Sequence, residues 1–167
     1  KDAIVGNSVG DAPGAIAKAA RKIEAVYSYP HQNHACMETM NATVKWTPER
    51  CEVWVPTQNG EAALAATAEA AGLKPVQCEV YKIHLGGGFG RRGATDFIRT
   101  AVNIAKQMPD TPIKMIWSRE EDMAQGRFHP VTHCKLVAGL DEKGEITGLT
   151  MRISGQSILS YVAPQMV

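Results

Sequence analysis

A glycine-rich loop at residues 84–93 constrains this chain more than any other stretch. Its sequence is HLGGGFGRRG, and four of the five residues from 86 to 90 are glycine. Glycine loses more conformational entropy on folding than any other residue, so a loop of this kind is costly to order. Glycine also permits positive φ angles and lets another group lie against the main chain. The loop therefore predicts a site that needs bare backbone.

The segments on either side of the loop predict a strand before it and a helix after it. Residues 76–85 (VQCEVYKIHL) are typical of a strand, and residues 94–108 have the apolar periodicity of an amphipathic helix that ends before Pro109. Unpaired N–H groups at the amino end of a helix favour an anion. Since Arg91 and Arg92 add positive charge, these features indicate an anionic ligand such as a phosphate.

The rest of the chain alternates between strands and helices. A helix is predicted over Glu61–Ala71, between a cap at Thr57 or Asn59 and a stop at Gly72. Half-buried or extended strands are predicted at residues 23–29, in 31–46, at 51–58 and at 112–118, and a closing hairpin surrounds residues 141–144. This order predicts an α+β fold, a two-layer α/β domain with a mixed sheet.

Composition places the chain among ordinary globular domains. Its 167 residues are 44% hydrophobic and 21% charged, which is enough to bury a core, and residues 1–167 are predicted to form a single domain. The formal net charge is only +1, so neither nucleic acid nor an anionic membrane surface is an expected partner. No apolar run approaches the roughly 20 residues that span a bilayer.

The cysteines and the ends of the chain give little information about metal clusters or about the cellular compartment of the protein. The four cysteines have no C-x-x-C spacing, which excludes a zinc ribbon or an iron–sulfur cluster read from spacing and favours free thiols. The chain runs from Lys1 to Val167 without a visible amino-terminal signal, and we expect it to be part of a longer protein. The sequence therefore predicts either a periplasmic or a cytoplasmic location and does not distinguish between them.

Two nucleotide-binding patterns can be tested against the loop. The Walker pattern fails because no Lys-Ser or Lys-Thr follows the last glycine. The dinucleotide (NAD or FAD) fingerprint is satisfied by Gly88-x-Gly90-x-x-Gly93, although the preceding strand is more polar than a buried parallel strand should be. A dinucleotide-binding domain and a non-enzymatic interaction module therefore remain alternatives.

Four motifs in order indicate a different ligand. They are HACMET (34–39), VPTQN (55–59), GGGFGRR (86–92) and SREEDM with GRFHP (118–130). Together they resemble the large subunit of the molybdenum hydroxylases, the xanthine dehydrogenase and aldehyde oxidoreductase family, most closely its isoquinoline 1-oxidoreductase-type branch. The resemblance implies a molybdopterin-binding domain that is part of a longer large subunit, in a bacterial type of enzyme.

The resemblance also assigns roles to residues. It implies cofactor binding by Gln58, Gly87, Gly88, Phe89, Gly90, Arg91 and Arg92. Gln58 matches the family glutamine that hydrogen-bonds to a ligand of molybdenum, and His34 and Glu38 match residues that support the site. Arg127 and His129 match a motif beside it, with a surface loop as the equal alternative. No protein side chain is expected to bind the metal, and His31, His34 and Cys36 are not predicted to do so, because positions 31 and 34 of an extended run project to opposite faces.

The implied function belongs to the whole subunit. The family cofactor is molybdopterin with molybdenum, expected here in its cytosine dinucleotide form, with iron–sulfur clusters on a small [2Fe-2S] partner subunit. The implied reaction is hydroxylation of an aldehyde or N-heterocycle with water-derived oxygen. Gly93 stands where purine-oxidising members carry an acidic residue, which disfavours a purine. No catalytic residue is predicted in this chain, because the family's catalytic glutamate belongs to a motif that it lacks, so the isolated chain is expected to be inactive.

Overall fold

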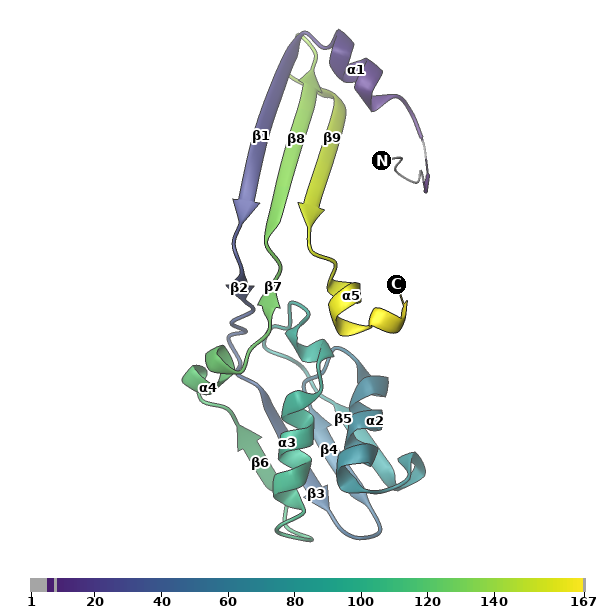
Figure 1. Cartoon of the computed structure of the whole chain (residues 1–167), viewed down its shortest axis with the longest axis vertical. Helices are drawn as coiled ribbons and strands as arrows, with labels where there is room; N and C mark the ends of the chain where they lie inside the picture. The colour runs from purple at the N-terminus through teal and green to yellow at the C-terminus, as the bar shows by residue number, and fades with distance from the viewer. Residues whose placement is uncertain (1–5, 8, 167) are drawn as a thin grey trace. The chain divides into compact units, whose positions relative to one another are not determined.

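The structure is a computed structural model that describes residues 6–7 and 9–166, and these form two compact units (Figure 1). One unit is the central part of the chain, Asn33–His129. The other combines the two ends, Lys1–Gln32 and Pro130–Val167. The prediction that residues 1–167 form a single domain stays a prediction. The division into two units arises because the strand that starts near residue 21 pairs with the strand after residue 131 and with no strand of the central sheet.

The central unit is built on a four-stranded mixed sheet. Its strands are β3 (Asn41–Trp46), β4 (Cys51–Val55), β5 (Cys78–Lys82) and β6 (Ile113–Ile116), in the order β5-β4-β3-β6. β3 is antiparallel to β4 and to β6, while β4 and β5 are parallel. The predicted hairpin around residues 47–50 and the predicted mixed sheet are both confirmed.

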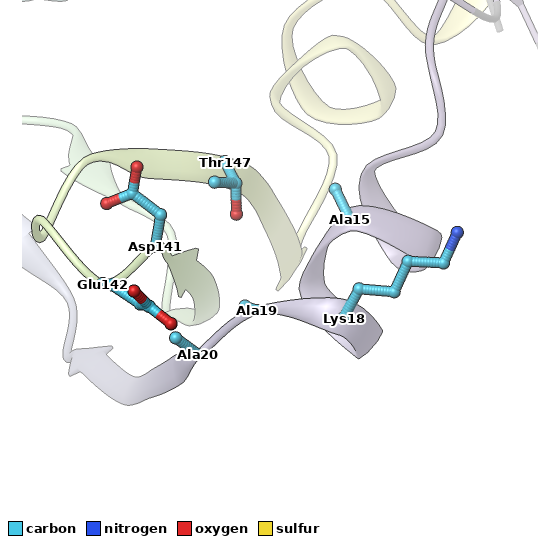
Figure 2. A pocket seen from close by; sticks show the side chains of 7 residues that line it. All are labelled: Ala15, Lys18, Ala19, Ala20, Asp141, Glu142 and Thr147. Atoms are coloured by element: carbon cyan, nitrogen blue, oxygen red, sulfur yellow. The ribbon is translucent and has the colours of Figure 1, made fainter.

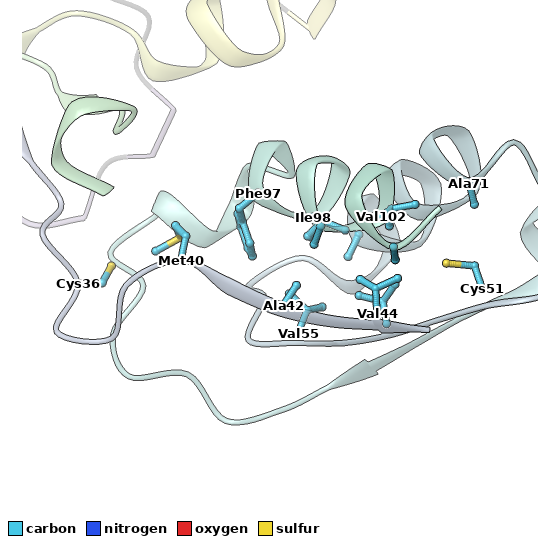
Figure 3. Close-up of a cluster of buried hydrophobic side chains, with 14 residues drawn as sticks. Cys36, Met40, Ala42, Val44, Cys51, Val55, Ala71, Phe97, Ile98 and Val102 are labelled. Atoms are coloured by element: carbon cyan, nitrogen blue, oxygen red, sulfur yellow. The ribbon is translucent and has the colours of Figure 1, made fainter. Parts of the chain in front are cut away.

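Two helices cover one face of this sheet. α2 (Gly60–Ala71) begins at Asn59, whose side chain accepts the Ala62 N–H, and ends at Gly72 in the left-handed conformation. α3 (Asp96–Ala105) turns a strongly apolar side to the sheet. Figure 3 shows the core, which consists of buried side chains of the sheet, of the two helices and of the segment before β3. They are Cys36, Met40, Ala42, Val44, Cys51, Val53, Val55, Ala63, Ala71, Phe97, Ile98, Ala101, Val102 and Ala105. The two-layer arrangement is thus confirmed.

The predicted strand at 76–85 is shorter in the structure. Residues Pro75–Gln77 form a 3-10 helix, and pairing with β4 covers only Cys78–Lys82. The chain leaves the sheet there because the glycine loop follows. Another 3-10 helix, Arg91–Gly93, leads from the loop toward α3, and α4 (Arg119–Ala124) follows β6. Two short strands, β2 (Gln32–Asn33) and β7 (Phe128–His129), pair with each other.

The unit made of the chain ends holds a three-stranded antiparallel sheet. Its strands are β1 (Arg21–Tyr29), β8 (Thr132–Leu140) and β9 (Ile146–Gly155), in the order β1-β8-β9. The predicted strand at 23–29 and the closing hairpin are confirmed. The expectation that 23–29 is half-buried is wrong, because eight of the nine residues of β1 are exposed.

Helices and short turns complete this unit. α1 (Ala12–Lys18) precedes β1, and α5 (Ile158–Val162) and a 3-10 helix (Pro164–Met166) follow β9. None of the described helices combines the length and the apolar character that crossing a membrane requires.

Candidate functional site in the glycine loop

One edge of the four-stranded sheet gathers all the motifs singled out in the sequence. β4, β5 and β6 run in the same direction, so their carboxyl ends lie at one edge together with the amino end of β3. The segment with Gln58 follows β4, and the glycine loop follows β5. Residues 34–40 precede β3, and residues 117–129 follow β6. Ligand sites of α/β sheets often lie at the carboxyl ends of parallel strands.

The glycines of the loop are required by its geometry. φ is +98° at Gly87 and +96° at Gly90, in the region where L side chains are strained. A Cβ on Gly88 would lie 2.6 Å from the Gln58 amide carbon, and one on Gly86 would lie 2.6 Å from the Glu38 Cβ. At Gly93, by contrast, a Cβ would meet no atom within 4 Å.

Three consecutive backbone N–H groups of the loop are left without partners. In the part of the chain that the structure describes, the N–H groups of Gly87, Gly88 and Phe89 make no hydrogen bond. φ is positive at Gly87 and Phe89 but not at Gly88. An alternation of this kind turns successive N–H groups toward one side and makes a concavity that attracts anions. The loop thus holds three neighbouring donors that no described protein atom satisfies.

Gln58 is held against this row by the loop itself. Its side-chain oxygen accepts the N–H groups of Gly90 and Arg92, both at 3.1 Å, and its backbone N–H donates to the Arg92 carbonyl at 3.1 Å. Two accepted bonds identify this atom as the oxygen, so the other atom of the amide is the NH₂ group. That NH₂ group has no partner among residues 6–7 and 9–166, and Gln58 is exposed. It is a fixed donor next to the loop.

Arg92 is fully buried and ties the loop to the neighbouring segments. Its guanidinium donates to the Gly87 carbonyl at 2.7 Å, to the Glu38 carbonyl at 2.7 Å and to the Glu38 carboxylate at 2.8 Å. The same carboxylate oxygen accepts the Gly86 N–H at 2.8 Å. Glu38 is therefore a support of the loop, in line with the role that the family resemblance implies.

Arg91 also turns inward. Its guanidinium makes two hydrogen bonds to the Asp96 carboxylate, at 2.9 and 2.7 Å, and lies over the Trp117 ring at 5.6 Å. The positive charges of Arg91 and Arg92 are thus paired with carboxylates of the protein, those of Asp96 and Glu38. The expectation that these charges face an anionic ligand is not met, because each guanidinium is 2% exposed or less and engaged by protein atoms.

His34 lies close to the loop at Gly90. Its Nδ1 donates to the Arg127 carbonyl at 2.9 Å, so its Nε2 carries the lone pair when the ring is neutral. A Cβ on Gly90 would lie 3.9 Å from this Nε2, and the His129 ring centroid is 4.1 Å from that of His34. Burial lowers the pKa of His34, which favours the neutral ring. Among the described residues no three His, Cys, Asp or Glu side chains are grouped to hold a metal ion.

Two supporting residues were not singled out from the sequence. Arg119 donates to the carbonyls of Cys36 at 2.6 Å and Met37 at 2.9 Å, and it pairs with Asp122 at 3.1 Å. Asp122 is buried although it lies in the first turn of α4. The spacing of Arg119 and Asp122, three apart on a helix, was the available hint of such a pair.

The pocket in Figure 2 is not part of this site. It lies in the other unit, between α1 and the turn that joins β8 to β9. Its lining residues are Ala15, Lys18, Ala19, Ala20, Asp141, Glu142 and Thr147. It contains none of the residues that the sequence predicts to bind a cofactor.

Comparison with known proteins identifies the kind of domain. Residues 1–159 match the family model of the molybdopterin cofactor-binding domain. The chain belongs to this family. It is 30% identical over 133 residues to the isoquinoline 1-oxidoreductase subunit beta of Brevundimonas diminuta, covering 78% of this chain and 17% of that protein. It is 26% identical over 143 residues to the aldehyde oxidoreductase molybdenum-binding subunit PaoC of Escherichia coli strain K12, covering 86% of this chain and 20% of that one.

Solved structures agree on the fold of this molybdopterin-binding domain. Quinoline 2-oxidoreductase from Pseudomonas putida 86 superposes with a TM-score of 0.58 at 20% identity, covering 86% of this chain and 18% of that chain. CO dehydrogenase from Oligotropha carboxidovorans gives 0.58 at 17% identity, covering 85% and 18%. The chain thus spans a fifth or less of the length of these proteins. The resemblance to the molybdenum hydroxylases is confirmed, and nothing in these matches favours the dinucleotide alternative.

Proposed function

We propose that this domain forms part of the cofactor cradle of a longer molybdenum hydroxylase. The observation that carries the proposal is the row of unpaired N–H groups at Gly87, Gly88 and Phe89, beside the fixed NH₂ group of Gln58. Donors held in place by the fold act as fixed dipoles toward charged ligand atoms and need no reorganisation when the ligand binds. Their chemistry suits the oxygen and sulfur atoms of a molybdopterin cofactor.

The residues of this chain would hold and orient that cofactor. The loop N–H groups and the Gln58 NH₂ would donate to it, while Arg92 and Glu38 keep the loop in shape from behind. When bound, the molybdenum centre supplies the redox chemistry that adds water-derived oxygen to the substrate. Neutral His34, with its Nε2 lone pair near Gly90, would accept a hydrogen bond from a donor at the rim of the site.

The remaining parts of the enzyme would come from outside this chain. We expect the catalytic base to lie elsewhere in the large subunit, and we propose the cytosine dinucleotide form of the cofactor and a small [2Fe-2S] subunit as electron carrier. An aldehyde or N-heterocycle is the proposed substrate. The family match and the relatives' names support this proposal, together with Gly93, where an acidic residue would favour a purine.

The variant Gln58→Glu tests the cradle in the full-length protein purified with its partner. Glutamate keeps an oxygen that can accept the Gly90 and Arg92 N–H groups, but it replaces the NH₂ donor with a second oxygen. Losing a hydrogen bond to a charged ligand costs about 1.5–3 kcal/mol, which corresponds to a roughly ten- to hundredfold loss of binding. We therefore expect molybdenum and pterin per subunit, and activity, to fall while the melting temperature of the apoprotein stays unchanged.

Gly93→Ala is the matched control, because a Cβ there meets open space. It should leave metal and pterin content at the wild-type level. Wild-type loading of the Gln58→Glu protein would contradict the proposed role of Gln58. The proposed cofactor cradle would itself be contradicted by one further result. That result is the absence of molybdenum, by elemental analysis, from the full-length protein purified with its native partner.

A further inference from the structure

The three-stranded sheet of the terminal unit has one apolar and one polar face. Side chains of paired residues lie on the same face, and successive residues alternate between faces. The pairing places three apolar rows on one face, listed from β1 through β8 to β9 as Ile23, Ala138 and Leu149, then Ala25, Leu136 and Met151, then Tyr27, Cys134 and Ile153. We call these nine residues the apolar face.

The opposite face is polar and already has a partner. There Lys135 of β8 pairs with Glu24 of β1 at 2.7 Å, and Ser28 and His133 lie 2.8 Å apart. α1 packs on this same face, since a Cβ on Gly139 would lie 2.8 Å from the Ala19 Cβ. Gly139 pairs with Gly148, where a Cβ would lie 3.1 Å from the Ala15 Cβ, so the helix crosses both strands. α1 therefore cannot cover the apolar face.

Within the described residues of the terminal unit, no element covers the apolar face. Its large side chains are exposed by 44–63% at Ile23, Tyr27, Leu149, Met151 and Ile153. Contiguous apolar surfaces of this kind are rare on soluble monomers and mark sites of association. In stable domains the apolar face of a sheet is buried against another layer, and among the described residues the apolar face has no such layer.

We propose that the apolar face is the docking surface for a segment of the same polypeptide that lies outside residues 1–167. The chain spans only 17–20% of the length of the two relatives described above, so most of such a polypeptide lies outside it. The docking segment would carry an apolar side and supply the missing layer. This inference rests on the longer polypeptide of the proposed function, but it does not depend on which group the glycine loop holds.

Cys134 provides a probe in the middle of this face. It is partly exposed, whereas Cys36 and Cys51 are buried, and all four cysteines are free. Burial raises the pKa of Cys51 to about 12 and also raises that of Cys78, so both are weak nucleophiles at pH 8. N-ethylmaleimide labelling at pH 8, resolved by peptide mass spectrometry, therefore reports on Cys134.

The experiment compares Cys134 labelling in the 167-residue chain and in the full-length protein. We expect labelling at least tenfold slower in the full-length protein. Equally fast labelling in both would overturn the proposal. Slow labelling in both proteins would also overturn the proposal. The apolar face would then be covered by a second copy of the 167-residue chain or by another part of that chain. Sedimentation over a range of concentrations separates these two cases.

A pair of variants in the full-length protein tests the same face by another readout. Tyr27→Asp puts a charge on the apolar face, and Val26→Asp puts one on the polar face, where Val26 is 61% exposed. We expect Tyr27→Asp to lower the melting temperature of the full-length protein and to raise Cys134 labelling, with Val26→Asp close to wild type. Equal effects of the two variants would contradict the assignment of the face.

Discussion

Gly88 and Gly93 carry the same side chain but meet opposite constraints. Gly88 is buried, and the space above its Cα is filled by the Gln58 amide, which two backbone N–H groups hold in place. Gly93 is exposed and faces open space. The spacing Gly88-x-Gly90-x-x-Gly93 thus matches the dinucleotide fingerprint in sequence but not in structure, because no close contact requires a glycine at position 93.

This difference predicts the effect of adding one methyl group at each position. Gly88→Ala should destabilise the chain by about 1–3 kcal/mol, because the new Cβ displaces Gln58 and breaks its two accepted hydrogen bonds. Gly93→Ala should change the free energy of unfolding by less than about 0.5 kcal/mol. Urea unfolding of the two variants measures both values, and equal costs would contradict the loop geometry.

His34 predicts a pH dependence of stability. Its pKa in the folded state lies below the usual 6.5, mainly because of burial, so the unfolded chain binds the proton more readily. The contribution of neutral His34 is therefore fully present above about pH 6.5 and is lost as the pH falls below that value. In unfolding experiments from pH 7.5 to 5, His34→Gln should show a shallower loss of stability than wild type. Parallel profiles of the two proteins would refute this role.

At the scale of elements, arginine side chains join segments that are distant in the sequence. Arg92 connects the loop after β5 to the segment before β3, and Arg119 holds Cys36 and Met37 from the start of α4. The sequence predicts the strands and helices themselves, since caps such as Asn59 and stops such as Gly72 act locally. It does not predict these links, because they depend on which strand ends meet at one edge of the sheet.

The Arg92 link predicts a large loss of stability on substitution. Arg92→Met removes a buried guanidinium that donates to the Gly87 and Glu38 carbonyls, and it leaves the partly exposed Glu38 carboxylate with the Gly86 N–H as its remaining donor. Losing these bonds together with the ion pair costs about 3–5 kcal/mol. Arg99→Met is the matched control, because Arg99 pairs with Glu69 on the surface, where such pairs contribute about 1 kcal/mol or less. Chemical denaturation compares the two. A loss for Arg92→Met no larger than that for Arg99→Met would contradict the structure.

At the scale of the whole molecule, the two units differ in how they are stabilised. The central sheet has a buried core between β3, β4 and the helices, whereas most side chains of β1 and β9 are exposed. Local opening costs less where few apolar contacts are buried. The docking proposed above would compensate for this in the full-length protein.

Hydrogen exchange of the 167-residue chain tests this difference. Amides of β3 and β4 should exchange more slowly than those of β8, even though β8 is paired on both sides. Within the three-stranded sheet, β8 should be protected more than the edge strands β1 and β9. Equal protection of β8 and β4 would show that the terminal unit is as stable as the central one.

The sequence by itself determined the local structure and the kind of domain. Alternating and helical patterns, caps and glycine stops act within a few residues, and the four ordered motifs carried the family resemblance that the family match confirms. Only the tertiary structure decided that Arg91 and Arg92 turn inward. It also decided that, among the residues it describes, the N–H groups at 87–89 remain unpaired and one face of the terminal sheet is uncovered. Each of these depends on partners supplied by distant segments, and local propensity contains no information about such partners.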